Sequence, residues 1–533
     1  MADEADKGPS KNALKKAAKE AEKAAKKAAK AATAQQQQAA EPEIPVEQLA
    51  EYFGELALAG PLNVPAPTTT LEKLPASGEV ILRAAVYNAR KQSAKLVFLN
   101  LRQGLSSIQA VLFANTPETK AMVKWAANIP VASIVLVHGE VKASPEKIAS
   151  ATIDDRELHI TNIHVVSRAV ERLPIQVEDA ERPIPADDAP VQETKEGERP
   201  ILSLPARLNN RVIDLKAIPN KAIFRIRHGI VSLFQEHLTS KGFVGIQTPK
   251  LIPTASEGGS NVFEVTYFDR KAYLAQSPQL YKQMVIASGF ERVFEVGPVF
   301  RAENSNTSRH LTEFTGLDME MEFDEDYHDV ITTLENLMLF IFKGLNTTYK
   351  RETELLQGMY GVEPFKLPEE GQVPRLKYPE AIAMLREAGE ELGDYDDLTT
   401  PQEKHLGRLV LAKYNTDFYV LDKFPTSVRP FYTMPDPENP KYSNSYDFFM
   451  RGQEILSGAQ RIHDAPFLRK RMAAMDPPVP EKGAEAYIEA FEYGCSRHGG
   501  GGIGLERIVT FWLGLPNIRM ATLFPRDPQR IAP

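Results

Sequence analysis

Apolar and polar residues follow several distinct patterns along this chain of 533 residues. Residues 1–40 form a low-complexity Ala/Lys stretch with almost no apolar face, and residues 41–75 resemble a Pro-rich linker. Within residues 76–170, short runs alternate with a period of two, which is typical of β-strands. Residues 206–533 mix long stretches of helical period with alternating strands, which predicts one large α+β domain. The acidic, Pro-rich residues 171–205 are the expected hinge.

The strands expected between residues 76 and 170 predict a small all-β barrel of the OB type, with one helix near Glu118–Ala127. Such barrels bind single-stranded nucleic acid by stacking bases on aromatics and pairing base edges with polar side chains. Phe98, with Arg90 before it and Gln109 on the next strand, would provide that set. The alternative is that Phe98 is a core aromatic. The expected strands are Glu79–Tyr87, Leu96–Leu101, Ser107–Leu112, Ser133–Val141 and Glu157–Ser167.

Composition indicates an intracellular protein. A single cysteine, Cys495, excludes disulfides and thiolate zinc clusters within one chain. Neither a signal-peptide core nor a membrane-length apolar run is present, so we expect a cytoplasmic protein without membrane contact.

The net charge of −8 hides a basic arm, because residues 1–40 carry many lysines and few acids. Lys11, Lys15, Lys19 and Lys23 recur at every fourth position and would share one stripe of a helix. The arm is either a solvated tail or a helix that forms against a phosphate backbone and adds salt-sensitive affinity.

Two segments of the large domain predict a packing helix and a hairpin that carries charged residues. Asn220–Lys241 has one apolar helical face and leads through a strand to Pro249, which indicates a packing helix and a candidate subunit contact. A strand over Glu291–Phe300 ends in Arg301, and Glu313–Phe323 returns with carboxylates on alternate positions. Aligned like charges repel unless cations or solvent offset them, so this hairpin indicates a charged site or a solvent-facing strand.

Two later segments supply metal ligands and a phosphate-binding turn. Asp447 and Glu454 are oxygen ligands suited to Mg²⁺, with Ser457 nearby, although a surface salt-bridged segment is the alternative. Gly499–Gly504 satisfies GxGxxG, but too few residues follow for a dinucleotide-binding fold. We expect a strand without side chains followed by a helix near Leu505, whose Arg507 points at a polyphosphate. A flexible Gly-rich turn is the alternative.

Taken together, these segments resemble the eukaryotic cytosolic type of aspartyl-tRNA synthetase, within the class II aminoacyl-tRNA synthetases. The three signature motifs of the class match Gly242–Leu251, Phe300–Glu322 and Gly502–Arg507. Ala275–Gln283 (AQSPQLYKQ) resembles the aspartyl form. The resemblance implies a class II catalytic domain with an antiparallel sheet flanked by helices, preceded by the OB barrel and the Lys-rich arm.

The resemblance also implies roles for individual residues. Arg301 and Arg507 are the expected catalytic residues, and Asp447, Glu454 and Ser457 would hold Mg²⁺. Arg90, Phe98 and Gln109 would read the anticodon. The residues expected to bind aspartate are Glu257, Gln279, Lys282, Asp318, Ser457 and Arg461. Those expected to bind ATP are Arg301, Glu303, Arg309, His310, Leu311, Phe314, Glu454, Gly504, Leu505, Glu506 and Arg507.

The implied reaction is formation of aspartyl-adenylate from L-aspartate and ATP, followed by transfer to the terminal ribose of tRNA(Asp). Lys282 and Arg461 would grip the substrate side-chain carboxylate, which disfavours asparagine and lysine. An asparaginyl- or lysyl-tRNA synthetase on the same scaffold and a non-catalytic tRNA-binding relative are the alternatives. The resemblance further implies a homodimer and allows membership of a multi-synthetase complex.

Overall fold

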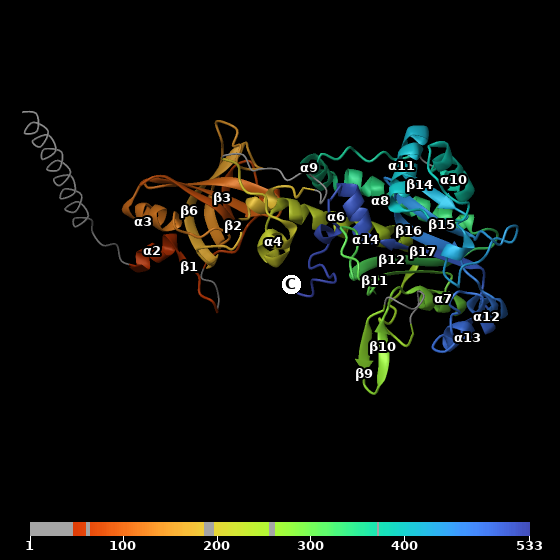
Figure 1. The fold of residues 1–533 in the computed structure, drawn as a ribbon. Helices are drawn as coiled ribbons and strands as arrows, with labels where there is room; N and C mark the ends of the chain where they lie inside the picture. The colour runs from red at the N-terminus through yellow and green to blue at the C-terminus, as the bar shows by residue number, and fades with distance from the viewer. Residues whose placement is uncertain (1–45, 60–63, 186–196, 255–261, 370–371) are drawn as a thin grey trace, which may run out of the picture. The chain divides into compact units, whose positions relative to one another are not determined.

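The computed structural model divides the chain into two compact units, which meet in the sequence between Arg172 and Leu173 (Figure 1). The Lys-rich arm and Glu257 lie outside the described residues, so what we expect of them stays a prediction. The structure describes residues 46–59, 64–185, 197–254, 262–369 and 372–533.

The first unit contains a six-stranded sheet in the order β1-β6-β4-β3-β2-β5, which a further pairing of β5 with β6 closes into a barrel. Its core is made by the inward face of each strand: on β3, Val97, Leu99 and Leu101 are fully buried. The predicted strands and the predicted helix of this unit are confirmed by the observed elements. The elements are α2 (Val46–Tyr52), β1 (Phe53–Glu55), η1 (Leu71–Lys73), β2 (Gly78–Ser93), β3 (Leu96–Gln103), β4 (Ser106–Phe113), α3 (Pro117–Ala126), β5 (Ile134–Ala143) and β6 (Arg156–Ser167).

Part of the Pro-rich segment over residues 41–75 forms regular secondary structure. Residues 46–55 form α2 and β1, and β1 pairs in parallel with β6. The physical reason is the edge of β6, whose backbone groups are satisfied when a further strand is added. The short apolar run at Tyr52 and Phe53 packs on the barrel core.

The second unit is built on an eight-stranded sheet in the order β13-β14-β15-β16-β17-β12-β11-β7. Each neighbouring pair of strands from β14 through β11 is antiparallel. A separate three-stranded sheet has the order β8-β10-β9. The strands are β7 (Val244–Gly245), β8 (Leu251–Ile252), β9 (Glu264–Tyr267), β10 (Arg270–Leu274), β11 (Arg292–Phe300), β12 (Glu313–Glu322), β13 (Arg375–Lys377), β14 (Phe418–Asp422), β15 (Ser445–Met450), β16 (Gln453–Gln460) and β17 (His498–Gly504).

Helices pack on this sheet, and the long apolar face predicted over Asn220–Lys241 forms α6, which contacts α8, α9 and α14 (Figure 1). Ile226, Ile230 and Phe234 on that face are fully buried. The helices of the unit are η2 (Asp179–Glu181), α4 (Leu204–Asn209), α5 (Arg211–Asp214), α6 (Ile218–Ser240), α7 (Gln279–Ala287), α8 (His328–Thr347), α9 (Lys350–Tyr360), α10 (Tyr378–Glu387), α11 (Thr400–Tyr414), η3 (Thr426–Val428), α12 (Ala465–Ala473), α13 (Glu485–Glu492), α14 (Leu505–Leu513) and η4 (Ile518–Ala521).

The central strand β12 is buried on both faces, which excludes the alternative of a solvent-facing polar strand. Leu317, Met319 and Met321 occupy one face, while Asp318 and Glu320 on the other are 5% and 0% exposed. The neighbouring strands β11 and β17 pair with β12 along most of its length. Buried carboxylates need cations or donors nearby, and these define the site below.

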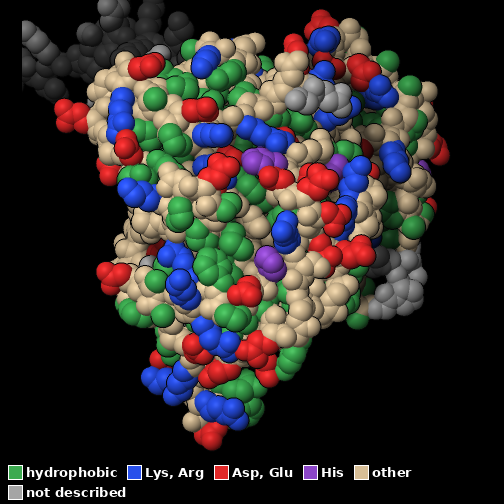
Figure 2. Space-filling model, turned by 90° about the vertical axis from the view of Figure 1, so that its right-hand side faces the viewer, with side chains coloured by type: hydrophobic (Ala, Val, Ile, Leu, Met, Phe, Trp, Pro, Cys, Tyr) green, Lys and Arg blue, Asp and Glu red, His purple; other side chains and the backbone are tan. Residues whose placement is uncertain are grey.

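On the face drawn in Figure 2, positive and negative side chains lie interspersed with apolar ones, without a large patch of one sign. Among the described residues, every helix is too short or too polar to span a bilayer.

Candidate active site

A cavity of about 400 Å³ opens over the middle of the eight-stranded sheet, lined by β11, β12, β16, β17 and the loops that join them. Most of the predicted site residues line it, although they come from segments far apart in the sequence. These residues are Gln279, Arg301, Glu303, Arg309, His310, Leu311, Phe314, Asp318, Glu454, Ser457, Arg461, Gly504, Glu506 and Arg507.

A buried charge network forms one end of the cavity. Lys282 on α7 is fully buried, and its Nζ lies 2.8 Å from Asp318 Oδ1 and 3.6 Å from Glu320 Oε2. Arg461, directly after β16, donates from Nε to Glu320 Oε1 at 2.9 Å and from Nη2 to the Gly500 carbonyl at 3.0 Å. Two cations and two carboxylates therefore balance in a region that excludes water.

The charges in this network hold each other ionised. Burial opposes ionisation of Glu320, but Arg461 and Lys282 outweigh it and keep the pKa of this carboxyl below its usual value. Burial likewise opposes the charge on Arg461, but Glu320 raises the pKa of the guanidinium further above its already high value. Neither cation turns toward bulk water, since Lys282 and Arg461 are 0% and 4% exposed.

The other end of the cavity is rich in arginine. Arg301, at the end of β11, lies over the ring of Phe314 at 5.4 Å, and Arg507 donates to the Glu454 carbonyl at 3.1 Å. His310 lies beside Arg309, with its Nδ1 2.6 Å from Thr307 Oγ1. Burial lowers the pKa of His310. The surrounding arginines lower this pKa further, whereas Glu303 raises it. A group of cations converging on one cavity is suited to a polyanion such as a nucleotide triphosphate.

The glycine-rich strand β17 lies between β12 and β16, and the expected helix α14 begins at Leu505. A Cβ on Gly500 would overlap the carbonyl oxygen of Met319, so this position needs glycine for the close approach of the strands. The carboxylate of Glu506 accepts from Arg227 at 2.7 Å and from the Thr315 amide, and Leu505 is buried. Glu506 lines the cavity, whereas Leu505 does not.

The residues predicted to hold Mg²⁺ lie close together on the β15–β16 hairpin. Asp447 is paired with Ser457 in the strand register, while Glu454 is half-buried at the cavity wall beside Arg507. Arg429 donates to Ser457 Oγ at 2.9 Å and to Asp447 Oδ2 at 2.7 Å. Burial raises the pKa of Asp447 to about 6, although Arg429 opposes this shift.

In the barrel, the predicted base-reading residues share one outer face. Phe98 alternates with the core residues of β3 and is only partly buried, so it is not a core aromatic. Arg90 lies opposite it across the β2–β3 pair, with its guanidinium 5.2 Å from the Phe98 ring. Gln109 on β4 donates to Glu157 at 3.3 Å, which adds a carboxylate to this face.

Several residues of the site were not identified from the sequence. Arg429 lies in a loop without a motif, and nothing in the sequence indicates its pairing with Asp447. Gln283 and His498 lie beneath the cavity and are fully buried. Glu320 was visible in the alternating pattern of β12, but its pairing with Arg461 depends on contact between β12 and a residue 141 positions later.

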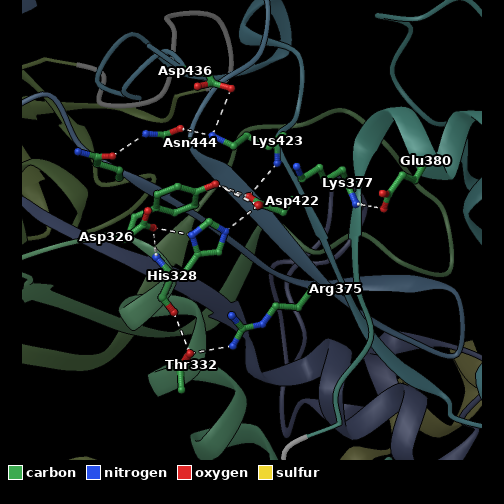
Figure 3. A network of polar contacts seen from close by, with 12 residues as sticks. Asp326, His328, Thr332, Arg375, Lys377, Glu380, Asp422, Lys423, Asp436 and Asn444 are labelled. Atoms are coloured by element: carbon green, nitrogen blue, oxygen red, sulfur yellow. Dashed lines mark hydrogen bonds and ion pairs between the residues drawn. The ribbon is translucent and has the colours of Figure 1, made fainter. Parts of the chain in front are cut away.

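A second polar network surrounds Asp422 and Lys423 at the end of β14 (Figure 3). Lys423 Nζ contacts Asp436 Oδ2 at 3.2 Å and donates to Asn444 Oδ1 at 2.7 Å, and Asn444 in turn donates to Gln460, next to Arg461. Asp422 accepts from Tyr327 at 2.8 Å and lies 3.0 Å from His328 Nε2. The network therefore links the start of α8 to the strand that positions Arg461.

The family comparisons agree with this architecture. Residues 203–528 match the family described as tRNA synthetases class II (D, K and N). Residues 80–166 match the OB-fold nucleic acid binding domain. The first match covers more than half of the chain, and with the antiparallel sheet and its cavity it defines a class II aminoacyl-tRNA synthetase.

Similar proteins narrow the class further. The chain is 53% identical over 454 residues to the cytoplasmic aspartate–tRNA ligase of Homo sapiens, covering 85% of this chain and 88% of that protein. It therefore belongs to the family of aspartyl-tRNA synthetases, the eukaryotic cytoplasmic type. The solved aspartyl tRNA synthetase from Entamoeba histolytica is 46% identical, with a TM-score of 0.80 over 90% of this chain and 96% of that one. An asparaginyl-tRNA synthetase from Pyrococcus horikoshii complexed with asparaginyl-adenylate is 29% identical, with a TM-score of 0.72 over 85% and 96%.

Proposed function

We propose that the protein attaches L-aspartate to tRNA(Asp) through an aspartyl-adenylate. The single observation that carries the choice of aspartate is the charge balance at the buried end of the cavity. Lys282 and Arg461 are matched there by Asp318 and Glu320 before any substrate binds.

A bound amino acid changes that balance in a way that selects its side chain. Its ammonium group would take Asp318 as partner, and its α-carboxylate would face Arg301 at the nucleotide end. Among the protein's carboxylates, Lys282 and Arg461 then have only Glu320 as a partner. One of their two positive charges is therefore not neutralised. The β-carboxylate of aspartate neutralises this charge, whereas the amide of asparagine leaves it buried and unpaired.

The chemistry then needs positioning and charge neutralisation more than proton transfer. The α-carboxylate of aspartate is already ionised and attacks the α-phosphate of ATP, releasing pyrophosphate. Arg301 would neutralise charge that develops on the α-phosphate, while Arg507 and His310 would bind the outer phosphates. The terminal ribose hydroxyl of tRNA then attacks the mixed anhydride and takes the aspartyl group.

The hairpin of β15 and β16 is suited to Mg²⁺. Among the described residues, Asp447 Oδ1 is buried and has no hydrogen-bond donor, although the other oxygen is held by Arg429. Asp447, Glu454 and Ser457 supply oxygen ligands of the type that Mg²⁺ prefers, so these residues fit the ion. The bound ion would neutralise the phosphates of ATP and hold them in register.

The remaining partners follow from the outer surfaces of the two units. Phe98, Arg90 and Gln109 would stack and contact anticodon bases, and the Lys-rich arm would add affinity for the tRNA backbone. The edge strand β7 exposes Val244, which is 46% exposed, so this side of the sheet suits the contact of a homodimer. A cytoplasmic location agrees with the named location of the relatives. Membership of a multi-synthetase complex stays a prediction of the resemblance.

Amino-acid-dependent exchange of pyrophosphate into ATP tests the proposal directly. Aspartate should support exchange, while asparagine and lysine should support hardly any. Equal rates with asparagine would contradict the charge argument, and exchange with lysine alone would favour the lysyl alternative. Absence of exchange with every amino acid, together with intact tRNA binding, would favour the non-catalytic alternative.

A further inference from the structure

A directional chain of hydrogen bonds runs beneath the amino-acid end of the cavity and ends on Arg461. It begins at the carbonyl of Ser496, which lies 2.8 Å from His498 Nδ1. His498 Nε2 lies 3.2 Å from Gln283 Nε2, and Gln283 Oε1 lies 3.2 Å from Gln279 Nε2. Gln279 Oε1 accepts from Arg461 Nη2 at 3.2 Å.

The direction of this chain follows from its first member. A carbonyl oxygen only accepts, so the proton of the neutral imidazole is on Nδ1 and the lone pair is on Nε2. Gln283 must then direct its amide N–H at His498 and its carbonyl at Gln279. Gln279 in turn must donate to Gln283 and present its own carbonyl to Arg461. The ring nitrogen therefore sets the orientation of the Gln283 amide, and the same orientation of Gln279 is also favoured by Arg461 and by Glu320 Oε2, which lies 3.5 Å from Gln279 Nε2.

Burial keeps the chain in this one arrangement. His498 and Gln283 are 0% exposed, and Gln279 is 5% exposed, so water does not compete for these groups. Burial also lowers the pKa of His498 to about 4, which leaves the imidazole neutral near pH 7. The ring stacks on Phe491 with centroids 6.1 Å apart, which fixes its plane. Tyr487 donates a further hydrogen bond to Gln283 Oε1 at 3.0 Å.

We propose that His498 is a positioning residue for amino-acid selection, acting through Gln283 and Gln279 on the guanidinium of Arg461. This inference rests on the proposed function, because it assigns to Arg461 the task of holding the substrate side-chain carboxylate. His498 does not line the cavity, so it acts on the substrate only through the chain.

The consequence of breaking the chain follows from the donors and acceptors. Without an acceptor at position 498, the amide N–H of Gln283 is buried without a partner, and the amide regains both orientations. When it turns over, its N–H group meets the N–H group of Gln279, and this conflict is relieved only when Gln279 turns over too, away from Glu320 Oε2, and directs an N–H group at Arg461. Arg461 then loses one of its acceptors and keeps Glu320 and the Gly500 carbonyl.

The test replaces His498 by phenylalanine, which retains the ring and its stacking but accepts no hydrogen bond. Pyrophosphate exchange should show a KM for aspartate raised by about 5- to 100-fold, from the loss of buried hydrogen bonds. The KM for ATP should stay within about twofold, since the arginine-rich end of the cavity is not part of the chain. His498→Gln, which offers an acceptor oxygen at the distance of Nε2, should recover part of the loss.

Two further variants separate positioning from a general loss of stability. Gln283→Met breaks the same chain, so it should raise the KM for aspartate to a similar degree, and the double variant with His498→Phe should be no worse than either. Tyr487→Phe removes a donor but leaves the direction of the chain unchanged, so its KM should change by less than about threefold.

The outcomes distinguish this inference from the proposed function. An unchanged KM for aspartate in His498→Phe, with normal exchange by the wild-type protein, overturns the inference and leaves the function standing. Equal rises of the KM for aspartate and for ATP also overturn it, since they indicate a general structural defect. Wild-type exchange with an amino acid other than aspartate overturns the proposed function. A selective rise in the KM for that amino acid in His498→Phe would still support the positioning role.

Discussion

Replacing Lys282 by methionine tests the charge count at the buried end of the cavity. Methionine keeps most of the side-chain length and removes the charge. Arg461 and Glu320 then balance each other, so a substrate β-carboxylate would enter without a free cation to meet it. Asparagine, which carries no side-chain charge, loses much less.

The magnitude follows from the burial of the group. Lys282 Nζ is fully buried and lies within 3.6 Å of two carboxylates, so it acts without screening by water. Removing one partner of such a pair costs about 2–5 kcal/mol, which corresponds to a fall of about 30- to 5000-fold in kcat/KM for aspartate. The contact of Asp318 with the substrate ammonium group is common to both amino acids. The ratio of aspartate to asparagine therefore isolates the side-chain contribution.

Pyrophosphate exchange with each amino acid measures that ratio. Lys250→Met is the matched control, because Lys250 forms a similar ion pair with Glu295 outside the cavity. Lys250→Met should lower the free energy of unfolding and leave the preference for aspartate over asparagine unchanged. The reasoning would be refuted if Lys282→Met lowered kcat/KM equally for both amino acids, or by less than about fivefold for aspartate.

Three other predictions concern the strand register, the buried histidine and the arm. Gly500→Ala should lower the free energy of unfolding by about 1–3 kcal/mol or more, because its Cβ overlaps a β12 carbonyl. Gly358→Ala, in open space on α9, should raise it by about 0.5–1 kcal/mol, and urea unfolding that ranks the two the other way would contradict the packing. His498 has a pKa of about 4 when folded and 6.5 in its ordinary state, so the unfolded chain binds the additional proton and stability falls as the pH drops from 6.5 to 4. His498→Phe should show a shallower fall over that range, and identical slopes would count against the buried neutral ring. Deleting residues 1–40 should weaken tRNA binding and flatten its salt dependence without changing pyrophosphate exchange, and an unaltered salt slope would indicate a solvated tail.

The barrel and the core of the large sheet were predictable because their signals are local. The strand β3 was predictable from its own residues, although the structure was needed to place Val97 and Leu99 in the core and Phe98 on the opposite face. The glycine run that forms β17 and the helix at Leu505 were predictable for the same reason. Each depends only on neighbours within one element.

The parts of the site that were missed depend on distant contacts. Arg429 pairs with Asp447 from a loop that has no periodicity, and Arg227 on α6 donates to the carboxylate of Glu506 from a distant segment. The strands β13 and β14 lie in a stretch where the sequence carries no motif. They complete the sheet and pack against α10 and α11. Burial in the tertiary structure determines such features, and the spacing of residues in a single sequence does not reveal that burial.

A structure of the protein with a non-hydrolysable aspartyl-adenylate analogue would test the central claim most directly. The account predicts the β-carboxylate within ~3 Å of both Lys282 Nζ and the Arg461 guanidinium, with Gln279 still accepting from Arg461. A ligand whose β-carboxylate lies away from these two cations, or cations that keep only their own carboxylates as partners, would contradict it.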